Sequence, residues 1–187
     1  TLPVHIRQLP YAMFSADTVC LGDPTQFNSN LSIPHASGIS SYSWNFGDGS
    51  PFGTLPNPTH TYATAGIFTV TLTIVNTNGC IKDTTRLVPV NPLPVPGFTF
   101  NAPSCSGAST CFTDLSSTPP GYLGSITRWI WHFGDGSPRD TIWFPDNPNI
   151  CHVFAGSALS HIVRLTVMSS DSCSAFIEHT ANSIPSP

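Results

Sequence analysis

WNFGDGSP at residues 44–51 returns, with one change, as WHFGDGSP at residues 131–138. A motif that recurs after a domain-length interval indicates internal repetition. Such a repeat is typical of a protein built from similar structural domains, and it points less directly to an active site. In each copy a tryptophan on an alternating segment leads into a Gly-Asp-Gly turn, where glycine permits positive φ and aspartate can cap the turn's own amides. The sequence therefore predicts two similar small domains and makes a catalytic centre the less expected answer.

The composition of the 187-residue chain excludes several functional classes. Charged residues make up only 9% of the chain, and uncharged polar residues, glycine and proline are typical of short strands and turns rather than helices. The chain has a net charge of −4 and no run of basic residues, so the sequence does not indicate a positively charged surface for nucleic acid. No apolar run approaches the length of a membrane-spanning helix, so no membrane insertion is expected.

Alternating hydrophobic residues predict β-strands along the chain. Residues 67–74 alternate strictly, which places Phe68, Val70, Leu72 and Ile74 on one face. No segment shows a sustained helical period. Several short strands separated by Gly, Pro and Asn turns predict an all-β fold, in which each repeat forms a sandwich of two antiparallel sheets.

The repeat sets the expected domain boundaries. We expect domain 1 at residues 11–91 and domain 2, with its proline-rich linker, at residues 92–187. Residues 1–10 would be the last strand and linker of a preceding repeat. The stretch at residues 89–96 predicts a short, semi-rigid linker in the polyproline II conformation. We therefore expect the parent protein to be a longer array.

The six cysteines predict disulfides and an oxidising compartment, because none lies in a CxxC pair. Each repeat has one cysteine before a Gly-containing segment and one after a strand and polar turn, at matching places. The choice of partners rests on this symmetry and not on geometry. Pairing equivalent cysteines within each repeat predicts Cys20–Cys80 and Cys105–Cys173, and the two remaining cysteines, present only in repeat 2, give Cys111–Cys151.

The repeated motif resembles that of the PKD (polycystic kidney disease) domain, an immunoglobulin-like β-sandwich. This family combines Trp-x-Phe-Gly-Asp-Gly with a Pro-Thr-His-x-Tyr stretch, and residues 58–66 read PTHTYATAG. Repeat 2 reduces the second element to HVFAG at residues 152–156. The resemblance implies two tandem immunoglobulin-like β-sandwich (PKD) domains. It assigns a fold role to Trp44, Phe46, Gly47, Asp48, Gly49, His60 and Tyr62, and to Trp131, Phe133, Gly134, Asp135, Gly136, His152 and Phe154.

The turn aspartates, Asp48 and Asp135, are candidate calcium ligands, because some members of this family bind Ca²⁺. In those members an acidic residue commonly lies between the tryptophan and the phenylalanine. This chain has Asn45 and His132 there, which weakens an oxygen-rich site for a hard cation. We therefore expect a structural turn and no bound calcium or other cofactor.

Neither zinc binding nor catalysis is expected. The seven histidines form no i, i+4 pair and no Cys/His metal spacing. For His60 and His152 the resemblance implies a neutral ring that hydrogen-bonds near the Gly-Asp-Gly turn. The sequence has no nucleophile elbow and no acidic pair that differs from turn residues, so we expect that the chain is not an enzyme.

Two segments are candidate interfaces. Residues 138–151 form an enlarged loop in repeat 2, and its Trp143 and Phe144 either fold back onto the domain or contact a neighbouring domain or subunit. The segment that contains Val4 and Ile6 is a candidate for strand addition to an exposed sheet edge.

Short acceptor patterns suggest glycosylation. Asn30-Leu31-Ser32 is an N-linked sequon. Three further Asp-Thr-x triplets resemble the acceptor of some bacterial O-glycosylation systems, although such short patterns arise easily by chance in a Thr-rich chain. Their threonines are Thr18, Thr84 and Thr141.

Together these observations predict a noncatalytic module of an extracellular or cell-surface repeat protein, expected to be bacterial. Its expected role is structural or adhesive, as a stalk or as a filament or sheath building block. The expected partners are neighbouring repeats, other copies in a homopolymer, or a cell-surface or polymer ligand, but not nucleic acid. The alternative is an accessory polymer-binding module of a secreted protease or polysaccharide hydrolase, which domains of this kind accompany. A eukaryotic adhesion ectodomain is a third hypothesis.

Overall fold

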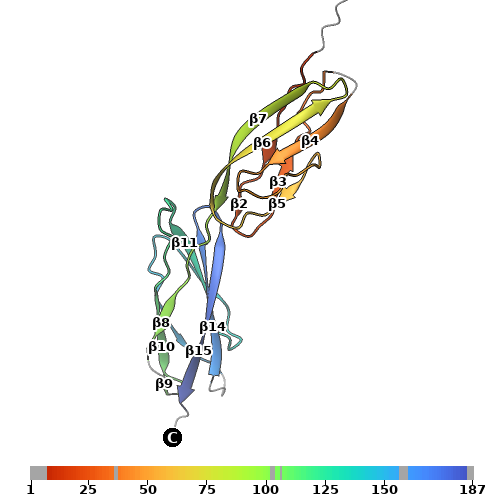
Figure 1. The fold of residues 1–187 in the computed structure, drawn as a ribbon. Coiled ribbons are helices and arrows are strands. Elements are labelled where there is room, and N and C mark those ends of the chain that lie inside the picture. Colours follow the sequence, from red (N-terminus) through yellow and green to blue (C-terminus); the bar gives the residue numbers. More distant parts are fainter. Residues whose placement is uncertain (1–7, 36–37, 102–103, 106, 156–159, 185–187) are drawn as a thin grey trace, which may run out of the picture. The chain divides into compact units, whose positions relative to one another are not determined.

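The computed structural model describes residues 8–35, 38–101, 104–105, 107–155 and 160–184. The chain forms two compact units, Thr1–Asn91 (unit 1) and Pro92–Pro187 (unit 2). Every regular element of the described ranges is a β-strand, which confirms the all-β prediction (Figure 1). Accordingly, the described residues include no helix that is long and apolar enough to cross a membrane.

Unit 1 is a sandwich of a three-stranded sheet and a four-stranded sheet. The strand orders are β1-β3-β5 and β2-β7-β6-β4. The long strands β6 and β7 pair antiparallel along almost their whole length, so they form the largest continuous ladder of this unit. The strands are β1 (Ser15–Ala16), β2 (Val19–Cys20), β3 (Thr25–Asn28), β4 (Ile39–Asn45), β5 (Thr59–His60), β6 (Gly66–Asn76) and β7 (Ile81–Asn91).

The core of unit 1 lies between these two sheets. Alternation along β6 buries Val70, Leu72 and Ile74 completely, as the pattern predicts, because successive side chains of a strand point to opposite faces. Trp44 from β4 is also fully buried, and Phe14 meets it edge-on with 5.1 Å between ring centroids. Aliphatic and aromatic side chains therefore fill the space between the sheets together.

Unit 2 repeats this plan with a three-stranded and a five-stranded sheet. The strand orders are β13-β10-β8 and β12-β11-β14-β15-β9. Trp131 and Phe133 occupy the core as Trp44 and Phe46 do in unit 1. The strands are β8 (Phe98–Phe100), β9 (Ser104–Cys105), β10 (Ser109–Asp114), β11 (Ile126–His132), β12 (Asp140–Trp143), β13 (Ile150–Val153), β14 (Ser160–Ser169) and β15 (Ser174–Ile184).

In both units an early strand runs parallel to the last one. In unit 1, β2 pairs parallel with β7, with Cys20 opposite Asn91. In unit 2, β9 pairs parallel with β15, with Cys105 opposite Ile184. The second strand of each unit is thus joined directly to the last strand by backbone pairing, a feature that the sequence pattern did not indicate.

The cysteine pairing predicted for unit 1 is wrong. Cys20 lies beside Asn91 at the end of β7, whereas Cys80 directly precedes Ile81, where β7 begins. The length of this 11-residue strand, about 33 Å, therefore separates the two cysteines. Cys80 is a free thiol, although Cys20 is disulfide-bonded.

The predicted Cys105–Cys173 bond is wrong for the same reason. Cys105 lies opposite Ile184 at the end of β15, whereas Cys173 directly precedes Ser174 at its start. Cys173 is disulfide-bonded, but not to the cysteine at the far end of this strand. Repeat symmetry correctly matches Cys20 with Cys105 and Cys80 with Cys173. Within each unit, however, the two cysteines lie at opposite ends of the last strand.

The enlarged segment of unit 2, residues 138–151, is not a loop throughout. Asp140–Trp143 forms β12, which pairs antiparallel with β11 at the edge of the larger sheet. The Thr-Ile-Trp sequence of this strand favours β structure, which the loop prediction overlooked. Cys111 and Cys151 lie directly opposite each other in the β10–β13 pair and form a disulfide.

The proline-rich stretch is also more ordered than a free linker. Residues 89–91 belong to β7, where Pro89 lies opposite Ile67. Val95 exchanges two backbone hydrogen bonds with Ser117, at 2.8 and 2.9 Å. The expected polyproline linker over residues 89–96 is therefore largely wrong, because both of its ends are paired within a unit.

Candidate functional site

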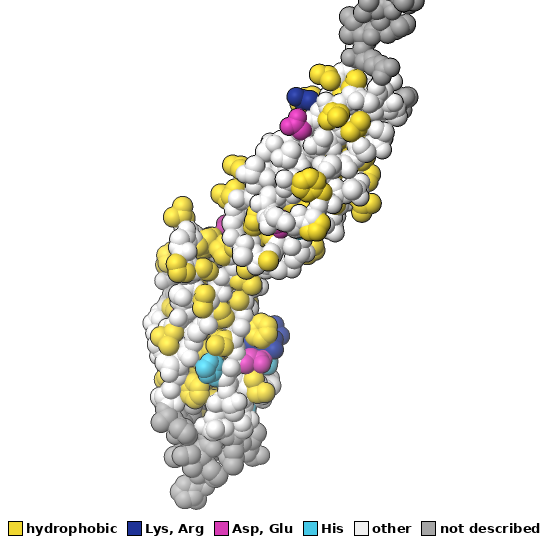
Figure 2. Space-filling view, in the orientation of Figure 1, with side chains coloured by type: hydrophobic (Ala, Val, Ile, Leu, Met, Phe, Trp, Pro, Cys, Tyr) yellow, Lys and Arg dark blue, Asp and Glu magenta, His cyan; other side chains and the backbone are white. Residues whose placement is uncertain are grey.

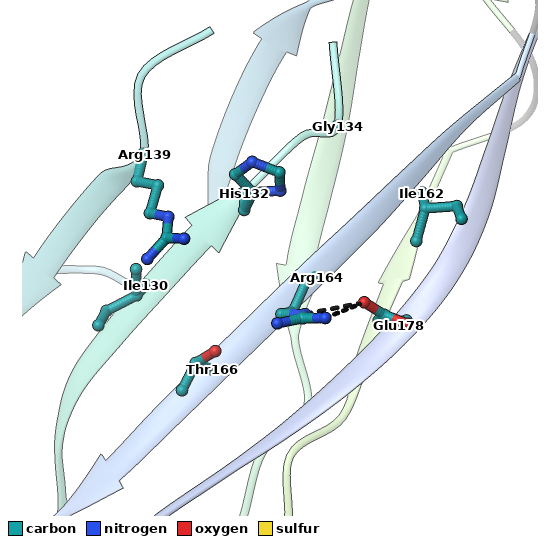
Figure 3. Close-up of a pocket in the computed structure, with 8 residues that line it drawn as sticks. All are labelled: Ile130, His132, Gly134, Arg139, Ile162, Arg164, Thr166 and Glu178. Carbon is teal, nitrogen blue, oxygen red and sulfur yellow. Dashed lines mark hydrogen bonds and ion pairs between the residues drawn. The ribbon is translucent and has the colours of Figure 1, made fainter. Parts of the chain in front are cut away.

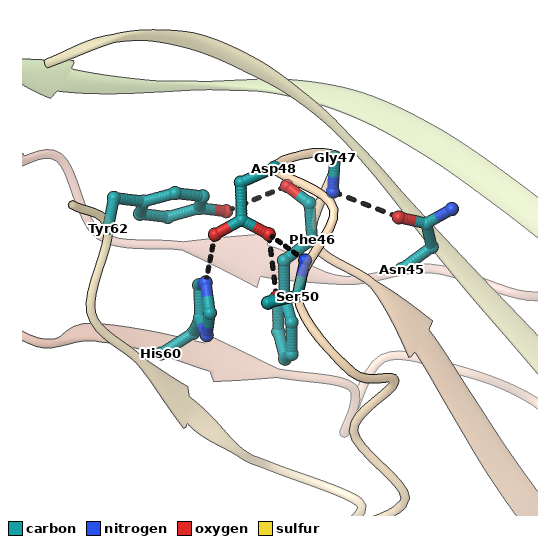
Figure 4. A network of polar contacts seen from close by, with 7 residues as sticks. All are labelled: Asn45, Phe46, Gly47, Asp48, Ser50, His60 and Tyr62. Carbon is teal, nitrogen blue, oxygen red and sulfur yellow. Dashed lines mark hydrogen bonds and ion pairs between the residues drawn. The ribbon is translucent and has the colours of Figure 1, made fainter. Parts of the chain in front are cut away.

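The repeated turn of unit 1 is held by the carboxylate of Asp48 (Figure 4). Its Oδ1 accepts hydrogen bonds from the backbone N–H and the hydroxyl of Ser50, at 3.1 and 2.6 Å, and its Oδ2 lies 2.7 Å from Nε2 of His60. A carboxylate only accepts hydrogen bonds, so Nε2 of His60 carries the proton that it donates. One aspartate thereby joins the turn to strand β5.

Aromatic rings surround this histidine. The ring of His60 stacks on Phe46 with 4.1 Å between centroids, and it meets Tyr62 edge-on at 4.6 Å. The hydroxyl of Tyr62 donates to the carbonyl of Phe46 at 3.1 Å, and the Tyr62 ring stacks on Phe68. Burial of Tyr62, with the charge of Asp48 nearby, raises the pKa of its hydroxyl above the ordinary value. The two sequence elements of the motif therefore form a single packed cluster.

The backbone of the turn approaches strand β6 closely at Gly47. This residue has a φ of +82°, and a Cβ there would collide with the carbonyl oxygen of Thr69. Its N–H donates to Oδ1 of Asn45 at 3.0 Å. Asn45, at the position where an acidic residue would favour calcium, is thus used to hold the turn.

Unit 2 builds the same cluster around Asp135. Its Oδ1 accepts from the backbone N–H and hydroxyl of Ser137, and its Oδ2 lies 2.8 Å from Nε2 of His152 and accepts from the N–H of Ala155. His152 stacks on Phe133 with 3.8 Å between centroids. The side chain of Asp135 is fully buried, so it depends on these donors even more than Asp48 does.

The electrostatics of both aspartates follow from these donors. Burial by itself would raise the pKa of Asp48, but hydrogen bonds from Ser50 and His60 outweigh it and lower the pKa to about 2. Burial also acts on Asp135, and donors from Ser137, Ala155 and His152 hold its pKa well below the usual range. Both carboxylates are therefore ionised wherever the protein is folded near neutral pH.

The low pKa of Asp48 predicts that unit 1 loses stability in acid. Because the folded pKa lies below the ordinary value of 3.8, the stabilisation is complete above that value and is lost as pH falls toward 2. The loss amounts to about 2 kcal/mol of unfolding free energy. Urea denaturation at a series of pH values, with hydrogen exchange in β4 and β6 as the probe for unit 1, measures it.

The variants Asp48→Asn and Asp17→Asn separate this pair from general acid effects. Asp48→Asn should lower the stability of unit 1 at pH 7 and flatten its pH dependence below pH 4. Asp17 is exposed, so Asp17→Asn should retain the wild-type acid loss. An unchanged acid loss in Asp48→Asn would contradict this assignment.

The turn carboxylates are thus engaged by the fold. Both oxygens of each aspartate face hydrogen-bond donors, which leaves them poorly placed to coordinate a cation. Among the residues that the structure describes, no group of three or more His, Cys, Asp or Glu side chains is placed to hold a metal ion.

The other candidate residues lie apart from the clusters. Trp143 is 55% exposed on β12 with the guanidinium of Arg128 over its ring, and Phe144 after it is 67% exposed. Trp143 thus packs partly on its own unit, and its contact with another domain or subunit stays a prediction. Among the proposed glycosylation sites, Thr18 and Thr141 are exposed and Thr84 is half-buried in β7.

The candidate strand around Val4 and Ile6 lies outside the described residues. No sequence pattern singled out the basic side chains of unit 2. Arg164 alternates with the buried Val163 and Leu165, so its position on the outer face of a sheet was readable from the sequence.

Comparisons with known proteins point to one family. Residues 7–89 match the family described as the PKD domain. The chain is 31% identical to the PKD1 domain of Vibrio anguillarum Epp, over 46% of this chain and 99% of that one, with a TM-score of 0.42. It is 29% identical to the PKD1 domain of the Vibrio cholerae metalloprotease PrtV, over 45% of this chain and 99% of that one, with a TM-score of 0.40. As the repeated motif indicated, the chain belongs to the PKD domain family.

Proposed function

We propose that the chain is a noncatalytic, load-bearing module of an extracellular protein, which serves as a stalk or as a filament or sheath building block. Its partners would be neighbouring repeats and other copies of the same protein. The disulfide Cys111–Cys151 supports an oxidising compartment outside the cytoplasm. The turn clusters support a structural role, since their polar groups are satisfied within each unit.

The observation that carries this proposal is the parallel pairing of the second strand of each unit with its last strand, β2 with β7 and β9 with β15, which we call the terminal-strand pairs. When the two ends of a unit are pulled apart, the parallel strands β2 and β7 slide past each other, so their hydrogen bonds are loaded together rather than one at a time. Leu21 adds a backbone bond from its N–H to the carbonyl of Asn91, at 2.8 Å. The β9–β15 pair gives unit 2 the same geometry.

Single-molecule force spectroscopy tests this role. We expect wild-type unit 1 to resist force and then to unfold in one step that releases about 250 Å of chain between Val19 and Asn91. Reductant must be present, because Cys20 is disulfide-bonded and a disulfide limits extension. The variant Leu21→Pro removes the N–H that bonds Asn91 and should lower the unfolding force.

Leu21→Ala is the matched control for this experiment. It removes most of the same half-buried side chain but keeps the N–H, so it should unfold at a higher force than Leu21→Pro. Equal unfolding forces for these two variants would show that the terminal-strand pair does not bear the load.

A second candidate is an accessory module of a secreted protease. The 29% identity to a domain of a protein named as a metalloprotease favours it. The complete coding sequence distinguishes the two: many further repeats favour the load-bearing role, and one protease domain favours the accessory role.

A further inference from the structure

The basic side chains of unit 2 gather on one face. Residues 92–187 contain only three Lys or Arg residues. Arg128 lies on β11 and Arg164 on β14, at positions that alternate with core residues, and Arg139 lies just before β12. We call the outer surface of β11, β14 and β15, with Arg139, the cationic face.

The cationic face contains a groove of about 320 Å³ (Figure 3). Arg139 and His132 line it together with Arg164 and Glu178, and Ile130 and other apolar or small residues complete the lining. Charged side chains are otherwise sparse on the surface seen in Figure 2, where most atoms are uncharged or hydrophobic. The groove therefore concentrates charge on a weakly charged protein.

Most of the positive charge here is not neutralised within the unit. Arg164 forms an ion pair with Glu178 at 2.7 Å. Within the described ranges neither Arg139 nor Arg128 has an acidic partner, and Arg128 instead contacts Trp143 and Met168. The Nε of Arg128 is buried without a hydrogen-bond partner. Two guanidinium groups thus have no acidic partner among the described residues, and that of Arg139 lines the groove.

Unit 1 shows that the fold does not require these charges. The registers of the two units correspond: Asn45 pairs with Thr71, and Thr71 with Thr85, where unit 2 has His132, Arg164 and Glu178. Thr71 and Thr85 are hydrogen-bonded at 3.0 Å, so an uncharged pair occupies the equivalent positions of the same fold. The fold therefore does not account for the charged residues of unit 2.

We propose that the cationic face binds a carboxylated polysaccharide, that is, a polymer of uronic acid sugars. Guanidinium groups bind carboxylates with paired, charge-assisted hydrogen bonds. Arg128 lies outside the groove, four residues and about 13 Å along β11 from His132, so a ligand that occupies the groove and also reaches Arg128 must be extended and carry more than one carboxylate. A polymer satisfies this requirement, and a single small anion does not.

Exposed aromatic rings favour a sugar polymer over an acidic peptide. Trp143 lies beside Arg128, and Phe176, 57% exposed, lies beneath the guanidinium of Arg164 at 4.4 Å. Such rings can pack against the C–H faces of pyranose sugars. A peptide would find no free backbone in the groove, because β11 and β14 are each paired on both sides.

Calorimetric titration of the 187-residue chain with oligogalacturonate tests the proposal. Fully methyl-esterified oligogalacturonate is the neutral control, and poly-L-glutamate represents an acidic peptide. We expect binding to oligogalacturonate alone, and weaker binding as salt is raised. Absence of binding, equal binding of the methyl ester, or equal binding of polyglutamate would overturn the proposal.

Variants then locate the site. Arg139→Ser should weaken binding by about tenfold or more, since it removes an unneutralised cation from the groove. The double variant Arg164→Thr/Glu178→Thr installs the pair found in unit 1, keeps the net charge and should also weaken binding. Lys82→Ser removes one positive charge from unit 1 and should leave the affinity unchanged. If Lys82→Ser weakens binding as much as Arg139→Ser, the polymer is attracted by positive charge anywhere on the protein, and the proposed site is wrong. These results do not depend on whether the chain bears load.

Discussion

Replacing Gly47 with alanine is expected to destabilise unit 1 by about 3 kcal/mol or more. An L-residue at its φ of +82° is strained, and the added Cβ would collide with the carbonyl of Thr69. This carbonyl belongs to β6, which pairs with β4 and β7 on its two sides, so it cannot move aside without breaking the sheet. Hydrogen exchange in the β6–β7 ladder measures the loss, with the strands of unit 2 as an internal reference.

Gly49→Ala is the matched control for Gly47→Ala. Gly49 has the same φ of +82°, but a Cβ there would meet no atom within 4 Å. We therefore expect only the conformational cost, about 1–2 kcal/mol. Equal effects of the two variants would mean that the left-handed backbone alone, and not the close approach to β6, makes glycine necessary in this turn.

Replacing Trp131 with alanine is expected to cost unit 2 about 3–5 kcal/mol. The side chain is fully buried, its ring meets Phe98 edge-on at 5.1 Å, and its Nε1 donates to the carbonyl of Pro148 at 3.1 Å. The substitution leaves a large cavity and an unpaired carbonyl. Urea denaturation monitored by hydrogen exchange in β11 and β14 measures the change.

Trp143→Ala in the same unit is the comparison for this variant. Trp143 is 55% exposed, and its described ring contact is with the guanidinium of Arg128. Its loss should cost no more than about 1 kcal/mol. A loss as large as that of Trp131→Ala would show that β12 is required for the stability of the unit, rather than added at the edge of its sheet.

The sequence predicted the β-sandwich cores well because strand periodicity is local. Alternation at Val70, Leu72 and Ile74 needs only the two-residue repeat of a strand to place these side chains on one face. The loop prediction around Trp143 failed because an edge strand forms only when a neighbouring strand offers its backbone, here β11. Strand pairing of this kind depends on residues distant in sequence.

The sequence likewise predicted only the local part of the candidate site. The Gly-Asp-Gly run predicted a turn capped by its own aspartate, and the structure adds the bond from Asp48 to His60, twelve residues later. The resemblance placed that histidine near the turn but did not name its partner. The cationic face was not predicted because Arg128, Arg139 and Arg164 are far apart in the sequence and do not form a run of basic residues.

By itself the sequence determined the all-β class, the two repeats and the aromatic core, because turn chemistry and alternating burial are properties of neighbouring residues. Only the tertiary structure decided which cysteines can meet, since repeat symmetry cannot show that Cys20 and Cys80 lie at opposite ends of β7. It also decided the parallel terminal strands and the gathering of arginines on one sheet. These features depend on strand order and register, and residues far apart along the chain set both.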